Sequence, residues 1–529
     1  MKNKPGEDFY LLNIFAFNKD NILLTGSNDK TAYQLGEIKK QGLTNTIISY
    51  FGIILGFINL IIVQPFFLTT EELGLTRILY SFSVVIATFL PLGITNITIR
   101  YFPRFRDPDK KHYGYFGLMM LFPLIGFMII SIMLLVFKDR IIAQYIEQSP
   151  LFTEYFFFII PLTLFVGLTA VLNIYCFSLF RTSFPTLLTD IIIRLLTIIL
   201  VIVYSLNIFP LNTFIIMFVG IYGIHVIVLL IYVYIIDRPG WEIDKDFLKK
   251  QNPPQLIIYG LTLTVAALSS LGIRYIDSMF IGSYLSLSMV AVYSVAAIIP
   301  TIIESPLLAL EKISNPKIAD AWNRSSLGEI RKIYYDSSKY LFLLGGLIFT
   351  GINISINDLL ELLPEDYISG LNVVYILSIS TLFNMATGAN NGIIFNSGHY
   401  RYGVFMLIVL IFLAVLLNII LIPLYGIAGA AIATGIANFT FNFLKFLFIK
   451  IKFKMQPFNT TSLKITGLIL ICIFIGLVMP VTGRNIPDII IRSITVTVIY
   501  LVSTHYLKLV KELYDDIPII GKKLKPRGN

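Results

Sequence analysis

Long apolar stretches of about 20 residues recur along almost the whole chain. The hydrocarbon core of a bilayer is about 30 Å thick, and an α-helix that rises about 1.5 Å per residue crosses it in about 20 residues. About fourteen such stretches lie between residues 43 and 508. Lipid offers no hydrogen-bond partner to an exposed backbone, so these stretches must be helical. The sequence therefore predicts an all-α integral membrane protein with about 14 transmembrane helices.

Polar residues, prolines and glycines separate the predicted helices, and Pro423 and Gly426 mark one of the sharpest turns. The predicted ranges are 43–67, 77–99, 114–137, 155–180, 186–206, 212–236, 256–276, 288–310, 340–356, 371–394, 403–423, 426–449, 463–480 and 489–508.

The composition excludes several other classes of protein. Hydrophobic residues make up 56% of the chain and charged residues 14%, against roughly 45–50% and 25% in soluble domains. The net charge of +10 is spread over short loops, so it does not indicate a nucleic-acid-binding surface. The two cysteines, Cys176 and Cys472, cannot form a disulfide framework or a zinc site. No metal or cofactor is expected.

Lys and Arg concentrate in alternate gaps between the helices, at residues 100–111, 238–250, 312–339 and 450–454, whereas the other gaps hold little beyond single residues such as Arg77. An excess of Lys and Arg marks the cytoplasmic side of a membrane. We therefore expect both termini to be cytoplasmic, which requires an even number of helices. The N-terminal segment is too polar for a signal peptide.

A weak internal similarity indicates a duplication. Residues 73–79 and 290–296 are loosely alike, and each follows the outer loop after the first or the seventh helix. The sequence predicts two six-helix lobes in a parallel pseudo-repeat, followed by two C-terminal helices, with the substrate path between the lobes. The expected division is a cytoplasmic extension at 1–42, an N-lobe at 43–236, a linker at 237–255, a C-lobe at 256–449, two further helices at 450–508 and a cytoplasmic tail at 509–529.

Arg194 is the charged residue that lies deepest in a predicted helix. A charge near the midplane costs at least about 2.5–3.5 kcal/mol on insertion scales, so it needs a reason to be there. Its guanidinium could bind a phosphate with two hydrogen bonds. Alternatively, Asp190 lies four residues earlier on the same helical face and could pair with it.

Three other charged residues lie nearer to helix ends. Arg274 and Asp277 are three residues apart, so they could bind substrate or could pair with each other. Glu304 lies between Pro300 and Pro306, where it could couple transport to an ion or simply be solvated at a broken helix end. Asp190 and Asp277 are further candidates for ion coupling or charge pairing.

Other polar residues fall on or near the later helices. Asn384 and Asn391 share one helical face with Thr381 and Gly388, where they could meet sugar hydroxyls or join neighbouring helices. Lys445 and Arg492 are close enough to helix ends to extend to the membrane surface. The segment 311–340 is expected to be an amphipathic surface helix or a plain connector.

Eight stretches in order resemble the polysaccharide transporters of the multidrug/oligosaccharidyl-lipid/polysaccharide superfamily, which include the bacterial O-antigen flippases. They cover residues 67–75, 92–103, 259–261, 274–277, 290–296, 360–367, 390–392 and 422–434.

The resemblance implies a V-shaped pair of six-helix lobes that alternate between inward-open and outward-open states. It also implies a flippase that moves a polyprenyl-pyrophosphate-linked oligosaccharide from the cytoplasmic to the outer leaflet for surface polysaccharide such as lipopolysaccharide. Cationic and polar cavity residues would bind the substrate, and here Arg194, Arg274, Asn384 and Asn391 are the candidates. The implied location is the bacterial inner membrane, alongside other polysaccharide-assembly membrane proteins.

Two alternatives stay open. A cation-coupled multidrug exporter of the same superfamily would share the scaffold, but it would need deep acidic residues in the first half, where Asp190 is the deepest. A membrane polysaccharide polymerase or ligase would need a large outer loop to hold acceptor sugars. The longest outer gap, at about residues 138–154, is short. A transporter rather than an enzyme is therefore expected.

Overall fold

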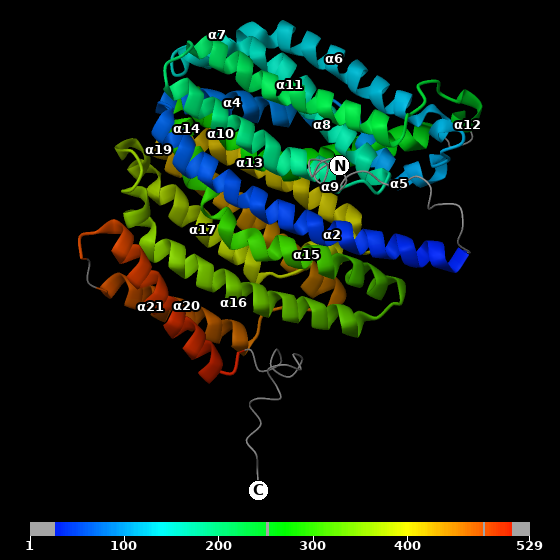
Figure 1. Cartoon of the computed structure of the whole chain (residues 1–529). Coiled ribbons are helices and arrows are strands. Elements are labelled where there is room, and N and C mark those ends of the chain that lie inside the picture. The colour runs from blue at the N-terminus through cyan, green and yellow to red at the C-terminus, as the bar shows by residue number, and fades with distance from the viewer. Residues whose placement is uncertain (1–26, 250–252, 480–481, 510–529) are drawn as a thin grey trace, which may run out of the picture.

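The computed structural model describes residues 27–249, 253–479 and 482–509, and within these ranges every regular element is a helix. Figure 1 shows long helices that run roughly side by side, with the first half of the chain on one side of the molecule and the second half on the other. Each predicted range overlaps a helix of the structure. The all-α membrane fold is confirmed.

The number of membrane crossings is not fixed by helix length alone. Ten helices in the described ranges are long and apolar enough to cross a membrane, or 11 if the bent pair α14–α15 is one span. The 54-residue α19 (Tyr400–Phe453) covers two predicted spans, because it breaks at Gly426, where φ is 59° and ψ is −140°. This backbone conformation is essentially restricted to glycine. Fourteen crossings remain a prediction.

The first predicted helix, expected to begin at residue 43, begins at Ser27 in the structure, inside the segment expected to be a cytoplasmic extension. The helices of the first half are α2 (Ser27–Phe57), η2 (Ile58–Val63), α3 (Gln64–Phe67), α4 (Thr70–Ala87), α5 (Ile94–Phe105), η3 (Lys111–Gly114), α6 (Tyr115–Ala143), α7 (Pro150–Tyr155), η4 (Phe156–Phe158), α8 (Ile159–Ser178), α9 (Ser183–Leu187), η5 (Leu188–Ile192), α10 (Ile193–Ser205) and α11 (Leu211–Ile236).

The second half follows the short helix α12 (Lys245–Lys249) and ends with α20 and α21, which lie beside α16 at the edge of the molecule in Figure 1. Its helices are α13 (Pro253–Tyr284), α14 (Leu287–Ile298), α15 (Thr301–Asn323), α16 (Leu327–Leu360), η6 (Glu365–Gly370), α17 (Leu371–Ala386), α18 (Asn390–Phe395), α19, α20 (Thr460–Val478) and α21 (Asn485–Tyr506).

The two halves meet most closely where α4 packs against α14. A Cβ atom on Gly74 would lie only 1.9 Å from the carbonyl oxygen of Leu287, so the backbones are in direct contact there. At the same end of the molecule, the Ser149 hydroxyl donates to the Gly282 carbonyl at 2.7 Å. These contacts, which we call the seam, join Gly74 to Leu287 and Ser149 to Gly282. The seam joins the halves at the helix ends far from the loops rich in Lys and Arg, which we call the basic side. The halves also meet nearer the basic side, where Arg100 of α5 lies 4.8 Å from the ring centre of Tyr259 of α13.

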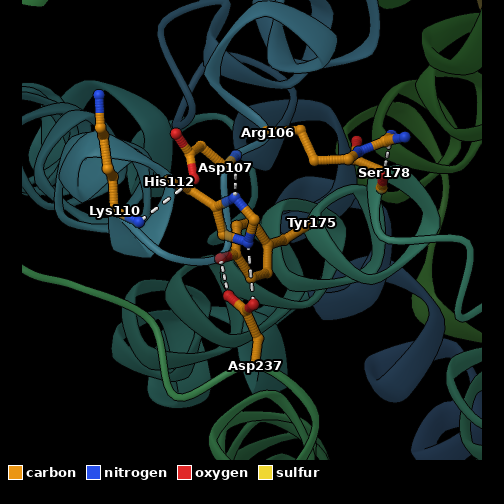
Figure 2. A network of polar contacts seen from close by, with 7 residues as sticks. All are labelled: Arg106, Asp107, Lys110, His112, Tyr175, Ser178 and Asp237. Atoms are coloured by element: carbon orange, nitrogen blue, oxygen red, sulfur yellow. Dashed lines mark hydrogen bonds and ion pairs between the residues drawn. The ribbon is translucent and has the colours of Figure 1, made fainter. Parts of the chain in front are cut away.

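A polar network fixes the first half at the basic side (Figure 2). The backbone N–H of Asp107 donates to Nδ1 of His112 at 3.0 Å, so Nε2 carries the proton and donates to Asp237 at 2.9 Å. The Tyr175 hydroxyl donates to the other oxygen of Asp237. The network offsets the cost of positive φ angles from Lys111 to Gly114, about 1–2 kcal/mol for each non-glycine residue. It ties the end of α11 to η3 and α8.

A buried ion pair anchors the two C-terminal helices. Arg492 of α21 donates to the carboxylate of Asp358 of α16 at 3.0 Å, and both side chains are about nine-tenths buried. The prediction that Arg492 extends to the membrane surface is wrong, because a partner on a neighbouring helix stabilises its charge inside the protein.

Replacing Arg492→Met should lower the free energy of unfolding by about 3–5 kcal/mol, because it leaves the Asp358 carboxylate buried without a cation. The measurement is the fraction of monodisperse protein left after heating detergent-purified samples. The matched control is the double variant Arg492→Met/Asp358→Leu, which should recover most of the loss. A double variant as unstable as the single one would contradict this role of the pair.

Candidate functional site

A cavity of about 1230 Å³ lies between the two halves. Helices α2, α4 and α10 of the first half form one wall, and helices α13, α14, α15, α17, α18 and α19 of the second half form most of the rest. Sites for small ligands commonly measure about 300–1,000 Å³, so this cavity has room for a larger polar group. Both amide and ionisable side chains line it.

The first-half wall carries two arginines. Arg194 of α10 donates through Nη1 to the carbonyl of Gly52 on α2, and it lines the cavity. Arg77 of α4 also lines the cavity and donates through Nη2 to the side-chain oxygen of Gln64. Among the described residues, Nε of Arg77 has no hydrogen-bond partner. This wall therefore presents two guanidinium groups, each with N–H donors beyond the one hydrogen bond described.

Two glycines on α2 make room for Arg194. A Cβ atom on Gly56 would lie 2.7 Å from Nη1 of Arg194, and one on Gly52 would lie 2.7 Å from Cβ of Asp190. Their spacing of four places both on one face of the helix, so α2 approaches η5 and α10 closely. Both facing segments contain a π-helical turn, η2 in one and η5 in the other, and such turns are frequent at functional sites.

Asp190 does not neutralise Arg194. Its carboxylate accepts a hydrogen bond from the Ser49 hydroxyl at 3.0 Å, and among the described side chains it forms no ion pair with Arg194. Asp190 is not among the residues that line the cavity. Asp190 and Arg194 therefore do not pair with each other, as their spacing allowed. Each instead contacts α2, and only Arg194 lines the cavity.

Asp277 of α13 is a carboxylate held by neutral donors. It is 2% exposed and accepts hydrogen bonds from Asn418 at 2.8 Å, from Thr434 at 2.7 Å and from the Tyr293 hydroxyl. No described cation pairs with it, and Oδ1 of Asn418 has no hydrogen-bond partner among the described residues. The side chain of Arg274, its expected partner, lies outside the described residues.

The remaining predicted site residues belong to a polar strip on α15, α17 and α18. Asn384 donates to Glu304 at 3.2 Å, and Asn391 donates to Glu311 at 3.2 Å. Lys445 of α19 donates to the side-chain oxygen of Asn391 at 2.8 Å. All five residues line the cavity. The tertiary structure thus brings Glu304 together with Asn384, and Glu311 together with Asn391, which sequence spacing could not show.

Sequence reasoning missed three cavity residues. Arg77 was expected in an outer gap, but α4 begins at Thr70 and places it two turns inside the helix. The signal was present, because Thr69 and Glu72 form a capping box that marks the start of a helix. Glu311 was expected on a surface segment, but α15 continues to Asn323. Lys445 was expected to extend to the surface, but it is 1% exposed.

Comparisons with known proteins agree with this architecture. A family model described as Polysaccharide biosynthesis protein matches residues 38–310, more than half of the chain. An uncharacterized membrane protein of Methanocaldococcus jannaschii is 21% identical over 485 residues, which cover 86% of this chain and 92% of that protein.

Solved structures of transporters share the fold. The lipid II flippase MurJ in an inward closed conformation matches with a TM-score of 0.70 at 14% identity, over 89% of this chain and 99% of that chain. An inward-facing multidrug resistance MATE family transporter of the MOP superfamily matches with a TM-score of 0.58 at 15% identity, over 78% and 98%. An all-α fold similar to these transporters is confirmed, and the two six-helix lobes in a V shape remain a prediction.

Replacing Gly52→Val should separate α2 from η5, since the added atoms meet the backbone of Asp190. Overpacking of this kind costs about 1–3 kcal/mol, so thermal unfolding of the purified protein should begin several degrees lower. Gly42→Val is the matched control on the same helix, because nothing lies within 4 Å of its Cβ position. Equal unfolding temperatures for the two variants would refute the close contact.

Proposed function

Because the chain belongs to the polysaccharide biosynthesis protein family, we propose that it is a flippase that carries a polyprenyl-pyrophosphate-linked oligosaccharide across the membrane. The observation that carries the proposal is the pair of arginines, Arg77 and Arg194, in one wall of the cavity. Guanidinium groups bind phosphate oxygens with short, charge-assisted hydrogen bonds. The pyrophosphate would lie between these two side chains while the lipid tail stays in the bilayer.

Alternating access would move the head group. The N-lobe (43–236) and the C-lobe (256–449) would rock about the linker at 237–255, so that the cavity faces each leaflet in turn. The seam at Gly74 and Leu287 supports a state closed at the end far from the basic side. The basic side would be cytoplasmic by the positive-inside rule, so loading would occur from that leaflet.

Asp277 would couple this cycle to a cation or proton gradient. A carboxylate, a hydroxyl and a carboxamide oxygen are the ligands that hard cations prefer. Asp277, Thr434 and Asn418 supply them from α13 and from the two parts of α19. Because these helices line the cavity, binding a cation there would change how they pack. Glu304, held by Asn384, is a second acidic group for the same role.

Either Arg77→Gln or Arg194→Gln should weaken binding of farnesyl pyrophosphate by about tenfold to a hundredfold, since a hydrogen bond to a charged group contributes about 1.5–3 kcal/mol. Thermophoresis of the detergent-purified chain measures this affinity. Arg331→Gln, at an exposed position on α16, is the matched control and should bind normally. Unchanged affinity in both cavity variants, with normal folding, would contradict the pyrophosphate site.

Asp277→Asn should abolish stimulation of transport by an imposed Na⁺ or H⁺ gradient while leaving farnesyl pyrophosphate affinity within about twofold. The carboxamide keeps the shape and loses the charge, so the helices should still pack. Flipping of a fluorescent lipid-linked disaccharide in proteoliposomes, with and without the gradient, provides the measurement. Gradient-driven flipping by the variant equal to that of the unaltered protein would exclude Asp277 as the coupling residue.

The alternative is a cation-coupled multidrug exporter, and the charges of the cavity oppose it. Two arginines in the first wall would repel cationic drugs. A strain that lacks the protein should therefore lose surface glycan while keeping its drug resistance. Loss of drug resistance with intact glycan would favour the exporter.

A further inference from the structure

A second polar region of the cavity lies apart from the two arginines. It is built from three carboxamides, two carboxylates and one lysine that belong to α15, α17, α18 and α19. We call it the amide subsite, and its residues are Glu304, Glu311, Asn384, Asn391, Asn442 and Lys445. Every one of them comes from the second half of the chain.

The hydrogen bonds within the amide subsite leave buried acceptor oxygens in it and beside it without a described partner. Asn442 is 3% exposed, lines the cavity and donates to the Asn438 carbonyl at 3.0 Å, yet its own Oδ1 has no partner among the described residues. Oδ1 of the neighbouring Asn315 is also buried without a described partner. Buried acceptors of this kind are normally satisfied, so the subsite calls for a ligand that supplies O–H or N–H groups.

The shape of the subsite fits a group larger than an ion. Glu304 and Glu311 are seven residues apart on α15, so their Cα atoms are separated by about 10 Å along the axis. Asn384 and Asn391 repeat this spacing on the facing elements and donate to them in turn. The subsite is therefore an extended strip of paired side chains, and Lys445 lies at the end formed by Glu311 and Asn391.

The charge of the subsite differs from that of the arginine wall. Two carboxylates and one ammonium leave a formal charge of −1, whereas Arg77 and Arg194 contribute +2 to the other wall. Lys445 is engaged by Asn391 and lies 4.1 Å from the ring centre of Phe441, so it is not presented as a free phosphate ligand. A carboxylate on the ligand would meet like charges here.

We propose that the amide subsite binds the sugar attached to the pyrophosphate and takes a neutral, hydroxyl-rich sugar in preference to an acidic one. This inference rests on the proposed function, because the arginines must hold the pyrophosphate while the sugar reaches the opposite wall. Sugar hydroxyls donate to the unpaired oxygens of Asn442 and Asn315. A uronic acid instead places its carboxylate near Glu304 and Glu311, and a site with desolvated like charges rejects such a ligand.

Three probes with the same lipid test the subsite on the full-length chain in detergent. They are farnesyl pyrophosphate, its glucosyl derivative and its glucuronosyl derivative, with affinity measured by thermophoresis. The glucosyl probe should bind about tenfold more tightly than the bare lipid, a gain of about 1.4 kcal/mol, because its hydroxyls add hydrogen bonds to the subsite. The glucuronosyl probe should show no such gain.

Two variants assign the effect to the subsite. Asn442→Leu should reduce the glucosyl gain to within about twofold while leaving the bare probe unaffected, and Glu311→Gln should restore binding of the glucuronosyl probe. Asn353→Leu is the matched control, because this buried asparagine donates to the Phe349 carbonyl within α16, its own helix, and does not line the cavity. It should keep the full glucosyl gain.

The outcomes separate the two levels of the proposal. Failure of all three probes to bind overturns the proposed function itself. Equal binding of the bare and glucosyl probes overturns the amide subsite alone, and so does a glucuronosyl probe that binds as tightly as the glucosyl one. A glucosyl gain that survives Asn442→Leu also overturns it.

Discussion

The absence of water inside a bilayer is the constraint on which the rest of this structure depends. Each backbone N–H and C=O must find its partner within the protein, so the chain folds into helices throughout its described ranges. The same constraint makes every buried charge expensive unless another group stabilises it. Buried charged residues therefore either form an ion pair between helices, as Arg492 and Asp358 do, or line a polar cavity, as Arg194 does.

Close backbone contacts decide where the cavity can open. At the seam, Gly74 lets α4 touch the backbone of α14, which joins the halves at one end. At Gly52 and Gly56, α2 instead closes on η5 and α10, which directs Arg194 into the space between the halves. Glycine is required in both places because any side chain would separate the helices. The walls that result differ in chemistry, with arginines on one side and carboxylates with amides on the other.

A cavity residue could be predicted from the sequence only where its own helix carried the signal. Arg194 could be recognised because an arginine deep in an apolar run is costly, although Asp190 offered a local partner that the structure does not use. Arg77 was misplaced because the apolar pattern starts after it, although the capping box of Thr69 and Glu72 lies just before it. Lys445 and Glu311 lie near the ends of apolar runs. Their burial depends on helices that are distant in the sequence, and no local pattern reports this.

The sequence by itself determined the fold class, because a run of about 20 apolar residues has one stable form in lipid. It also determined the approximate positions of the helices and the turn at Gly426, whose backbone angles only glycine adopts readily. Only the tertiary structure decided the partners of the charged residues. Asp190 meets Ser49 instead of Arg194, and Asp277 meets donors from α14 and α19. Hydrogen bonds depend on atoms a few ångströms apart in space, and spacing along a single helix does not fix those distances.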